Sequence, residues 1–153
     1  GERVSSTRLR RCLSEGDMPE YARLAGGSYA AEGAVEGGKR LGREIGFPTL
    51  NLPWEPECRP PYGVYAARVL EGGRAFEGVA NYGVAPSAGE LVRPVVEANL
   101  FETPDFGAGA KIRAEFLKFL RPEKKFESLD ALKAQIAEDR AAARAFFAKF
   151  GRY

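Results

Sequence analysis

The hydrophobic residues in the middle of the chain recur at the spacing of β-strands. Between residues 28 and 121, short runs rich in Val, Tyr, Phe and Gly are separated by turn residues. Within 111–120, apolar and charged side chains alternate as far as Phe116, which is the two-residue period of a half-buried strand. Leu117 and Phe119 then shift the phase, so we expect a β-bulge or a covering element there.

The same pattern predicts a hairpin and one further strand. Residues 63–70 and 75–81 are strand-like and flank the turn residues 71–74, two of which are glycine. Another strand is expected over 92–101. Short strands joined by turns favour an antiparallel sheet.

Helical spacing dominates the two ends of the chain. From about residue 128 onward an apolar stripe of near-helical spacing follows Ser128, a suitable N-cap, and extends towards Gly151. Residues 1–26 predict two short helices, the first capped by Ser6 or Thr7 and the second opened by Pro19.

Together these elements predict a mainly β fold. The expected architecture is a small closed six-stranded antiparallel Greek-key barrel with a long C-terminal helix and short N-terminal helices. Closing the barrel leaves no strand edge exposed, and the apolar stripe of the C-terminal helix can be buried against it. We expect two units: a helical segment over 1–26 and a barrel with its helix over 27–153.

Composition narrows the possible functions. The chain has 153 residues, 44% of them hydrophobic and 29% charged, and a net charge of +2, which is too small to indicate nucleic acid or an anionic membrane as partner. It contains no apolar run of about 18 residues, so no membrane span is expected. Two cysteines in unrelated contexts, Cys12 and Cys58, favour a reduced, cytoplasmic protein. Histidine is absent, which excludes histidine-based triads and the usual zinc enzymes.

The first candidate site is the segment from Gly33 to Asn51. Gly33, Gly37, Gly38 and Gly42 permit close backbone approach, and Lys39, Arg40 and Arg43 supply positive charge for phosphates. A flexible loop with solvated charges is the alternative, because short glycine patterns often match by chance.

Thr49 and Asn51 follow Pro48 and are two residues apart, so in an extended segment they present oxygen atoms on one face. Such ligands suit Mg²⁺ bound together with substrate phosphates. A simple turn with local hydrogen bonds is the alternative for this pair.

The second candidate is Glu97, a carboxylate within an otherwise strongly apolar strand. Alternation places Glu97 and Asn99 on one face, where Glu97 is either solvated or turned into a pocket. The charged loop from Arg121 to Phe126 is a third candidate; it is either solvated or closes over a substrate, with Arg121 or Phe126 against an aromatic ring.

In combination, these motifs resemble riboflavin kinases. The resemblance covers about residues 27–145 and rests on several motifs in the same order: Gly46-Phe47-Pro48-Thr49-x-Asn51, Gly63-Val64-Tyr65, Gly78-Val79-Ala80-Asn81-x-Gly83-x-x-Pro86, the Glu97 strand, the run 116–126, and Ser128-x-x-x-Leu132-x-x-Gln135-Ile136-x-x-Asp139.

The resemblance implies transfer of the γ-phosphate of ATP to riboflavin, giving FMN and ADP. Glu97 is then the catalytic base, and Thr49 and Asn51 are the Mg²⁺ ligands. The implied ATP-binding residues are Gly33, Lys39, Gly42, Arg43, Gly46, Pro48 and Thr49. The implied flavin-binding residues are Phe101, Arg121 and Phe126.

Residues 4–10 also resemble a motif near the end of the FMN adenylyltransferase domain of bacterial bifunctional FAD synthetases. We therefore expect this domain to precede the kinase module in the full-length enzyme. The chain departs from the family pattern at Asn99, where a histidine is common, and no role is transferred to that position. Two other hypotheses remain: a non-catalytic flavin- or nucleotide-binding barrel, and a single-stranded nucleic-acid-binding barrel, which the low net charge disfavours.

Overall fold

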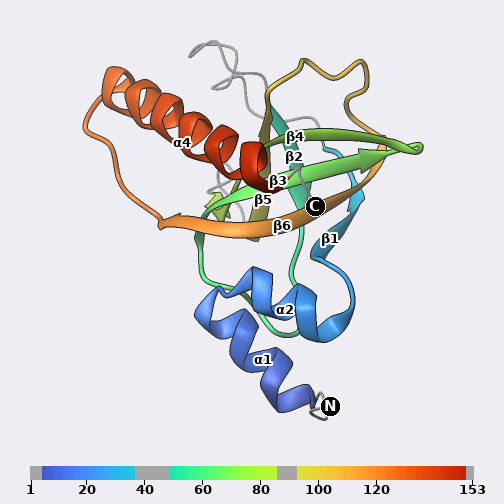
Figure 1. The fold of residues 1–153 in the computed structure, drawn as a ribbon. Coiled ribbons are helices and arrows are strands. Elements are labelled where there is room, and N and C mark those ends of the chain that lie inside the picture. Colours follow the sequence, from blue (N-terminus) through green and yellow to red (C-terminus); the bar gives the residue numbers. More distant parts are fainter. Residues whose placement is uncertain (1–4, 37–48, 86–92, 151–153) are drawn as a thin grey trace.

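The computed structural model describes residues 5–36, 49–85 and 93–150. Within these residues, six strands form one sheet in the order β1-β6-β3-β4-β5-β2, with all neighbours antiparallel (Figure 1). The strands are β1 (Tyr29–Ala34), β2 (Thr49–Pro53), β3 (Gly63–Glu71), β4 (Arg74–Ala85), β5 (Arg93–Leu100) and β6 (Lys111–Pro122).

The sheet curls until its first and last strands meet. An isolated antiparallel bridge pairs Glu36, just after β1, with Asn51 of β2, and the amide of Glu36 donates to the Asn51 carbonyl at 2.8 Å. Gly33 of β1 lies so close to β2 that an added Cβ would be 2.9 Å from a methyl group of Leu52. The predicted mainly β, six-stranded barrel is thus confirmed in outline.

Alternation fills the inside of the barrel with apolar side chains. Tyr65, Tyr82 and Phe116 are almost completely buried there, and the Phe116 ring contacts that of Tyr65 edge-on at a centroid distance of 5.0 Å. Trp54 stacks on Phe116 at 5.4 Å. The barrel interior is therefore a packed aromatic core, and a binding site is expected on another surface of the barrel.

The predicted bulge in β6 is present. Ala67 of β3 is opposite Phe116, whereas the preceding Ala66 is opposite Lys118, so Leu117 is the extra residue. Because an extra residue changes which face the side chains occupy, Leu117 belongs to a second apolar cluster on the outside of the barrel.

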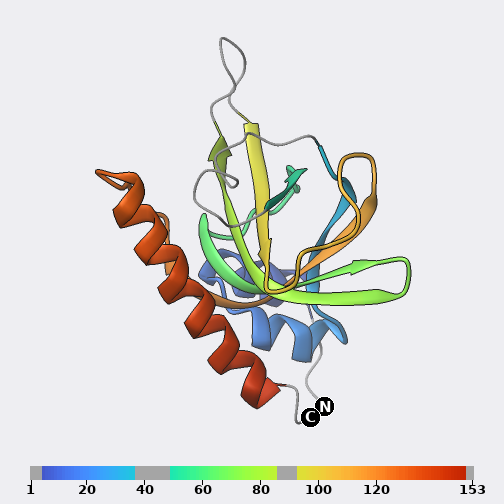
Figure 2. The ribbon, with the colours of Figure 1, turned by 90° about the horizontal axis from the view of Figure 1, so that it is seen from above.

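This outer cluster is covered by α4 (Leu129–Phe150), which runs along the outside of the barrel (Figure 2). Ala143 and Phe147 of the helix pack there against Val64, Val79 and Leu117. The amide of Ala131 donates to Ser128 Oγ at 3.1 Å, which confirms Ser128 as the N-terminal cap.

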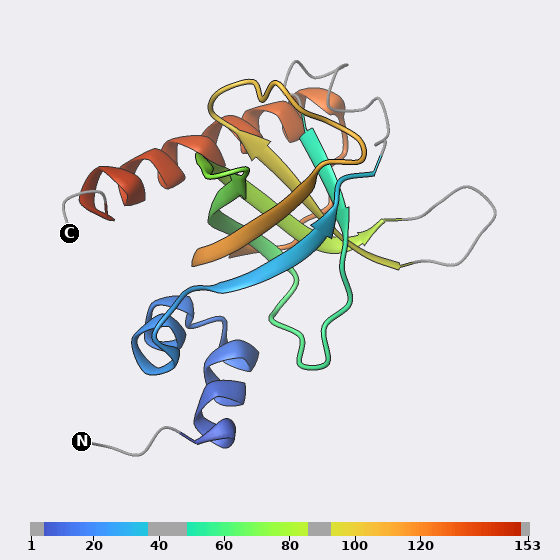
Figure 3. The same cartoon turned by 90° about the vertical axis from the view of Figure 1, so that its right-hand side faces the viewer.

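Two short helices lie below the barrel, α1 (Ser6–Glu15) and α2 (Met18–Ala25) (Figure 3). The N-terminal cap of α1 is Ser5, whose Oγ accepts a hydrogen bond from the Arg8 amide at 3.2 Å. The prediction that Ser6 or Thr7 caps this helix is therefore wrong. Three consecutive hydroxyl residues can each cap a helix, and Ser5 is the one with extended backbone angles.

The side chains of Leu13 and Met18 join the barrel core, so both helices pack on the barrel. Whether residues 1–26 belong with a preceding domain stays a prediction. None of the helices described is long and apolar enough to cross a membrane.

Candidate active site

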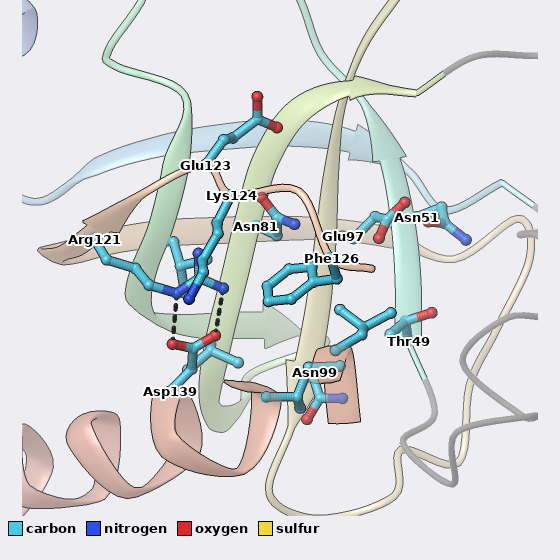
Figure 4. A pocket seen from close by; sticks show the side chains of 14 residues that line it. Thr49, Asn51, Asn81, Glu97, Asn99, Arg121, Glu123, Lys124, Phe126 and Asp139 are labelled. Carbon is cyan, nitrogen blue, oxygen red and sulfur yellow. Dashed lines mark hydrogen bonds and ion pairs between the residues drawn. The ribbon is translucent and has the colours of Figure 1, made fainter. Parts of the chain in front are cut away.

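A cavity of about 150 Å³ lies outside the barrel, between its wall, the start of α4 and the segment after β6 (Figure 4). It is lined by Thr49, Asn51, Val64, Val79, Asn81, Glu97, Asn99, Arg121, Glu123, Lys124, Phe126, Leu132, Ile136 and Asp139. All four predicted classes of site residue are therefore represented around one space: the base, the metal ligands, the flavin contacts and, through Thr49, the ATP-binding residues.

Strand register creates a polar row across the cavity wall. Glu97 of β5 is opposite Asn51 of β2 on one side and opposite Asn81 of β4 on the other. Its neighbours along the strand, Val96 and Ala98, point the other way into the core. Thus Glu97 faces the cavity, and the pocket hypothesis holds over the solvated-strand alternative.

Two residues back along β2, the next pair on the same face is Thr49 opposite Asn99. Figure 4 shows Thr49 and Asn51 on the same strand, with Glu97 beside Asn51 and Asn99 beyond Thr49. The predicted common face of Thr49 and Asn51 is confirmed, and Asn99 joins it from the neighbouring strand.

Arg121 is held at the cavity by a buried carboxylate from α4. Its Nε and one terminal nitrogen donate to the two oxygens of Asp139, both at 2.8 Å, in a bidentate pair. The Asp139 side chain is only 7% exposed, and Gln135 donates to it at 3.0 Å. Such a planar double contact fixes the direction of the guanidinium group.

The segment after Arg121 approaches the same space. The ring of Phe126 lies with its centroid 5.8 Å from the Arg121 guanidinium carbon and 5.8 Å from Lys124 Nζ. Glu123 sits against the backbone of Gly83, where any Cβ would collide with its carboxylate. The pairing of Arg121 with Asp139 therefore anchors a loop that presents an aromatic ring and two charges to the cavity.

Asn99 is contacted by Arg140, also from α4. The Arg140 guanidinium donates to Asn99 Oδ1 and to the carbonyl oxygen of Leu100, the latter at 3.2 Å. Burial, together with the nearby positive charge of Arg144, lowers the pKa of Arg140 below its ordinary value.

Some predicted residues lie elsewhere. Phe101 is outside the cavity lining and packs on α4, with its ring centroid 6.2 Å from that of Phe147 and 4.1 Å from the Arg144 guanidinium carbon. Gly33 is on β1, against Leu52. Lys39, Gly42, Arg43, Gly46 and Pro48 fall outside the described residues. The ATP- and flavin-binding roles of all these residues stay predictions.

Several lining residues were given no role from the sequence. Asn81 and Asp139 belong to motifs that carried the family resemblance, which was the available signal for them. Asn99 could have been assigned from its alternation with Glu97. Glu123 and Lys124 gave no signal beyond their position in a charged loop.

The oxygen atoms of Thr49 and Asn51 are among the donors in this wall that suit a hard cation. Within the described ranges there is no group of three or more His, Cys, Asp or Glu residues able to hold a metal. Few protein ligands are what Mg²⁺ needs when water and substrate phosphates fill the remaining positions. The residues present therefore fit Mg²⁺ bound together with a nucleotide.

Comparison with known proteins gives a consistent result. The riboflavin kinase family model matches residues 25–147. The bifunctional riboflavin kinase/FMN adenylyltransferase of Haemophilus influenzae is 40% identical over 147 residues, and that of Bacillus subtilis is 36% identical over 149 residues; in each case the match covers 95% of this chain and 47% of the relative. The chain thus spans about half the length of the curated relatives it matches.

The fold has a solved counterpart. A crystal structure described as a macrolide-efflux protein from Streptococcus pneumoniae superposes with a TM-score of 0.82 at 29% identity, covering 93% of this chain and 47% of that one. The family match spans the barrel and nearly all of α4, the two elements that enclose the cavity. The chain belongs to the riboflavin kinase family.

Proposed function

We propose that this chain transfers the γ-phosphoryl group of ATP to the 5′-hydroxyl of the riboflavin ribityl chain, giving FMN and ADP. The observation that carries the proposal is the position of Glu97. Its carboxylate lies between Asn51 and Asn81 in the wall of the cavity, one strand away from the predicted Mg²⁺ ligands.

In the reaction the ribityl oxygen forms a bond to the γ-phosphorus. The bond between that phosphorus and the bridging β–γ oxygen breaks, and ADP leaves with the electron pair. Glu97 accepts the proton of the attacking hydroxyl, a role its place in the cavity wall supports. Most of the rate acceleration in such transfers comes from positioning and from stabilising the charge on the phosphoryl oxygens.

Thr49 and Asn51 would hold Mg²⁺, which would supply positive charge to offset that of the nucleotide phosphates. The two side chains would do this from one strand face, beside Glu97, which is opposite Asn51 on the neighbouring strand. Gly33, Lys39, Gly42, Arg43, Gly46 and Pro48 are proposed to contact the rest of the nucleotide.

Riboflavin would enter from the side of the loop after β6. Phe126 offers an aromatic face, and Arg121, oriented by Asp139, offers a cation beside it. Phe101 is kept as a predicted flavin contact, although its ring packs on α4.

The direct test is to incubate the chain with riboflavin, ATP and Mg²⁺ and to look for FMN and ADP by chromatography. Both should form in equal amounts, and omitting ATP or adding excess EDTA should abolish both. Binding of riboflavin and ATP without FMN would overturn the proposal in favour of the non-catalytic barrel.

The relatives suggest a larger context. Their names combine riboflavin kinase with FMN adenylyltransferase, and this chain corresponds to about half of their length. We infer that it works as the kinase half of such an enzyme, preceded by the adenylyltransferase domain to which residues 1–26 would be linked. A cytoplasmic location stays a prediction, based on Cys12 and Cys58, both of them free thiols.

A further inference from the structure

Two consecutive residues of α4 face the cavity wall with opposite charge. Asp139 accepts from Arg121, and Arg140 donates to Asn99. The contact with Asp139 fixes the direction of the Arg121 guanidinium group. The contact with Arg140 orients the side-chain amide of Asn99, whose oxygen accepts hydrogen bonds and whose nitrogen donates them.

An arginine has donors and no acceptor, so it can be satisfied only by the oxygen end of the Asn99 amide. With Oδ1 turned to Arg140, the amide nitrogen of Asn99 lies on the side of Thr49 (Figure 4). Asn99 is only 6% exposed and lines the cavity. This orientation leaves the amide N–H groups as the end of Asn99 that can donate to a molecule bound in the cavity.

We propose that Asn99, oriented by Arg140, is a substrate-binding residue that donates a hydrogen bond to a phosphate oxygen of the nucleotide. This inference rests on the proposed function. The nucleotide is favoured over riboflavin because Asn99 is directly opposite Thr49, the predicted metal and phosphate ligand.

Arg140 is then a positioning residue. Its guanidinium group donates to the side-chain oxygen of Asn99 and to the Leu100 carbonyl, and its guanidinium carbon lies 5.3 Å from the centroid of the Phe101 ring. These three consecutive residues, at the end of β5, fix the direction of the Arg140 side chain. The Arg144 guanidinium carbon also lies over the Phe101 ring, 4.1 Å from its centroid, but Arg144 is not among the residues that line the cavity. It provides a matched arginine on the same helix.

The decisive variant is Asn99→Asp. The aspartate keeps the shape and still accepts from Arg140, while the donor towards the cavity becomes an acceptor. We expect the Kd of Mg-ADP, measured by calorimetry, to rise at least tenfold, and the Kd of riboflavin to change less than threefold. A Kd for Mg-ADP within threefold of the unaltered chain would overturn the proposal. Weakened riboflavin binding with unchanged Mg-ADP binding would overturn the choice of the nucleotide.

Arg140 is tested by comparison. Arg140→Met should weaken Mg-ADP binding three- to tenfold, Arg140→Lys should restore part of it, and Arg144→Met should leave it unchanged. Equal effects of Arg140→Met and Arg144→Met would show that only helix packing is involved and would contradict the positioning role. FMN formation by the unaltered chain in the same buffer tests the proposed function separately, so the two can fail independently. Should Arg140→Met fail to fold, Asn99→Asp decides the matter alone.

Discussion

The inner and outer faces of the barrel are built from the same strands and serve different ends. On β5, Val96 and Ala98 enter a core of aromatic rings, while Glu97 and Asn99 between and beyond them line the cavity. β4 repeats the arrangement, with Tyr82 inside and Asn81 outside. One strand thus contributes alternate residues to the core and the residues between them to the cavity wall. We therefore expect stability and activity to respond separately to mutation.

The strongest test of this separation is Glu97→Ala on the outer face. We expect kcat to fall at least about 100-fold, because removal of a general base typically costs that factor or more. The free energy of unfolding should change by less than about 1 kcal/mol, as for substitutions outside the core. Steady-state kinetics and urea unfolding measure the two quantities.

The matched control is Glu77→Ala, which removes an exposed carboxylate from β4 outside the cavity lining. Its kcat should equal that of the unaltered chain. Turnover by Glu97→Ala close to the control value would remove Glu97 from the mechanism.

The converse change on the inner face is Phe116→Ala. Phe116 is 1% exposed and contacts the rings of Tyr65 and Trp54, so truncation should cost about 3–5 kcal/mol of unfolding free energy. Denaturant unfolding gives this value, and the kcat of the folded fraction should stay within about twofold. A folded variant with strongly reduced kcat would show that the two faces are coupled.

A smaller effect on the outer face is expected for Thr49→Ala. Loss of one oxygen ligand should raise the Kd of Mg-ADP by about five- to tenfold, which corresponds to the roughly 1 kcal/mol typical of a single polar contact. Isothermal titration calorimetry with and without Mg²⁺ measures it. The exposed Thr103 offers the control Thr103→Ala, and identical affinities for both variants would exclude the ligand role.

The smallest expected effect is a difference in unfolding free energy between two tyrosine-to-phenylalanine substitutions in the core. The Tyr65 hydroxyl donates to the Pro61 carbonyl at 2.5 Å, whereas the buried Tyr82 hydroxyl has no hydrogen-bond partner among the described residues. Tyr65→Phe should therefore cost about 1 kcal/mol, and Tyr82→Phe should be neutral or slightly stabilising. A larger loss for Tyr82→Phe would point to an interaction of its hydroxyl beyond those residues.

The pH dependence of stability gives a second test of Tyr82. Burial raises the pKa of Tyr82 to about 12, above the value near 10 of an unfolded tyrosine. The unfolded chain therefore loses the proton first, and the stability contributed by neutral Tyr82 is complete below about pH 10 and is lost as pH rises towards 12. Tyr82→Phe should show a shallower decline in unfolding free energy over that interval.

Local patterns were sufficient for the parts of the protein that depend on neighbouring residues. Alternation placed Thr49 with Asn51 and Glu97 with Asn99, and the phase shift at Leu117 predicted the bulge, because both follow from the two-residue period of a strand. Ser128 was identified as a cap for a similar reason, since its partner amide is three residues away. The cap of α1 was missed because three adjacent hydroxyl residues satisfy the same local rule.

Contacts between distant segments could not be obtained in this way. That Glu97 lies between Asn51 and Asn81, that Asp139 holds Arg121 and that Arg140 orients Asn99 all depend on strand register and on where α4 docks. The packing of Phe101 on α4 likewise depends on where the helix docks, and its flavin-binding role stays a prediction. Strand register and helix docking are determined by the total apolar surface that the whole sheet and helix bury. That total depends on residues far apart in the sequence, so no short segment of the chain can predict it.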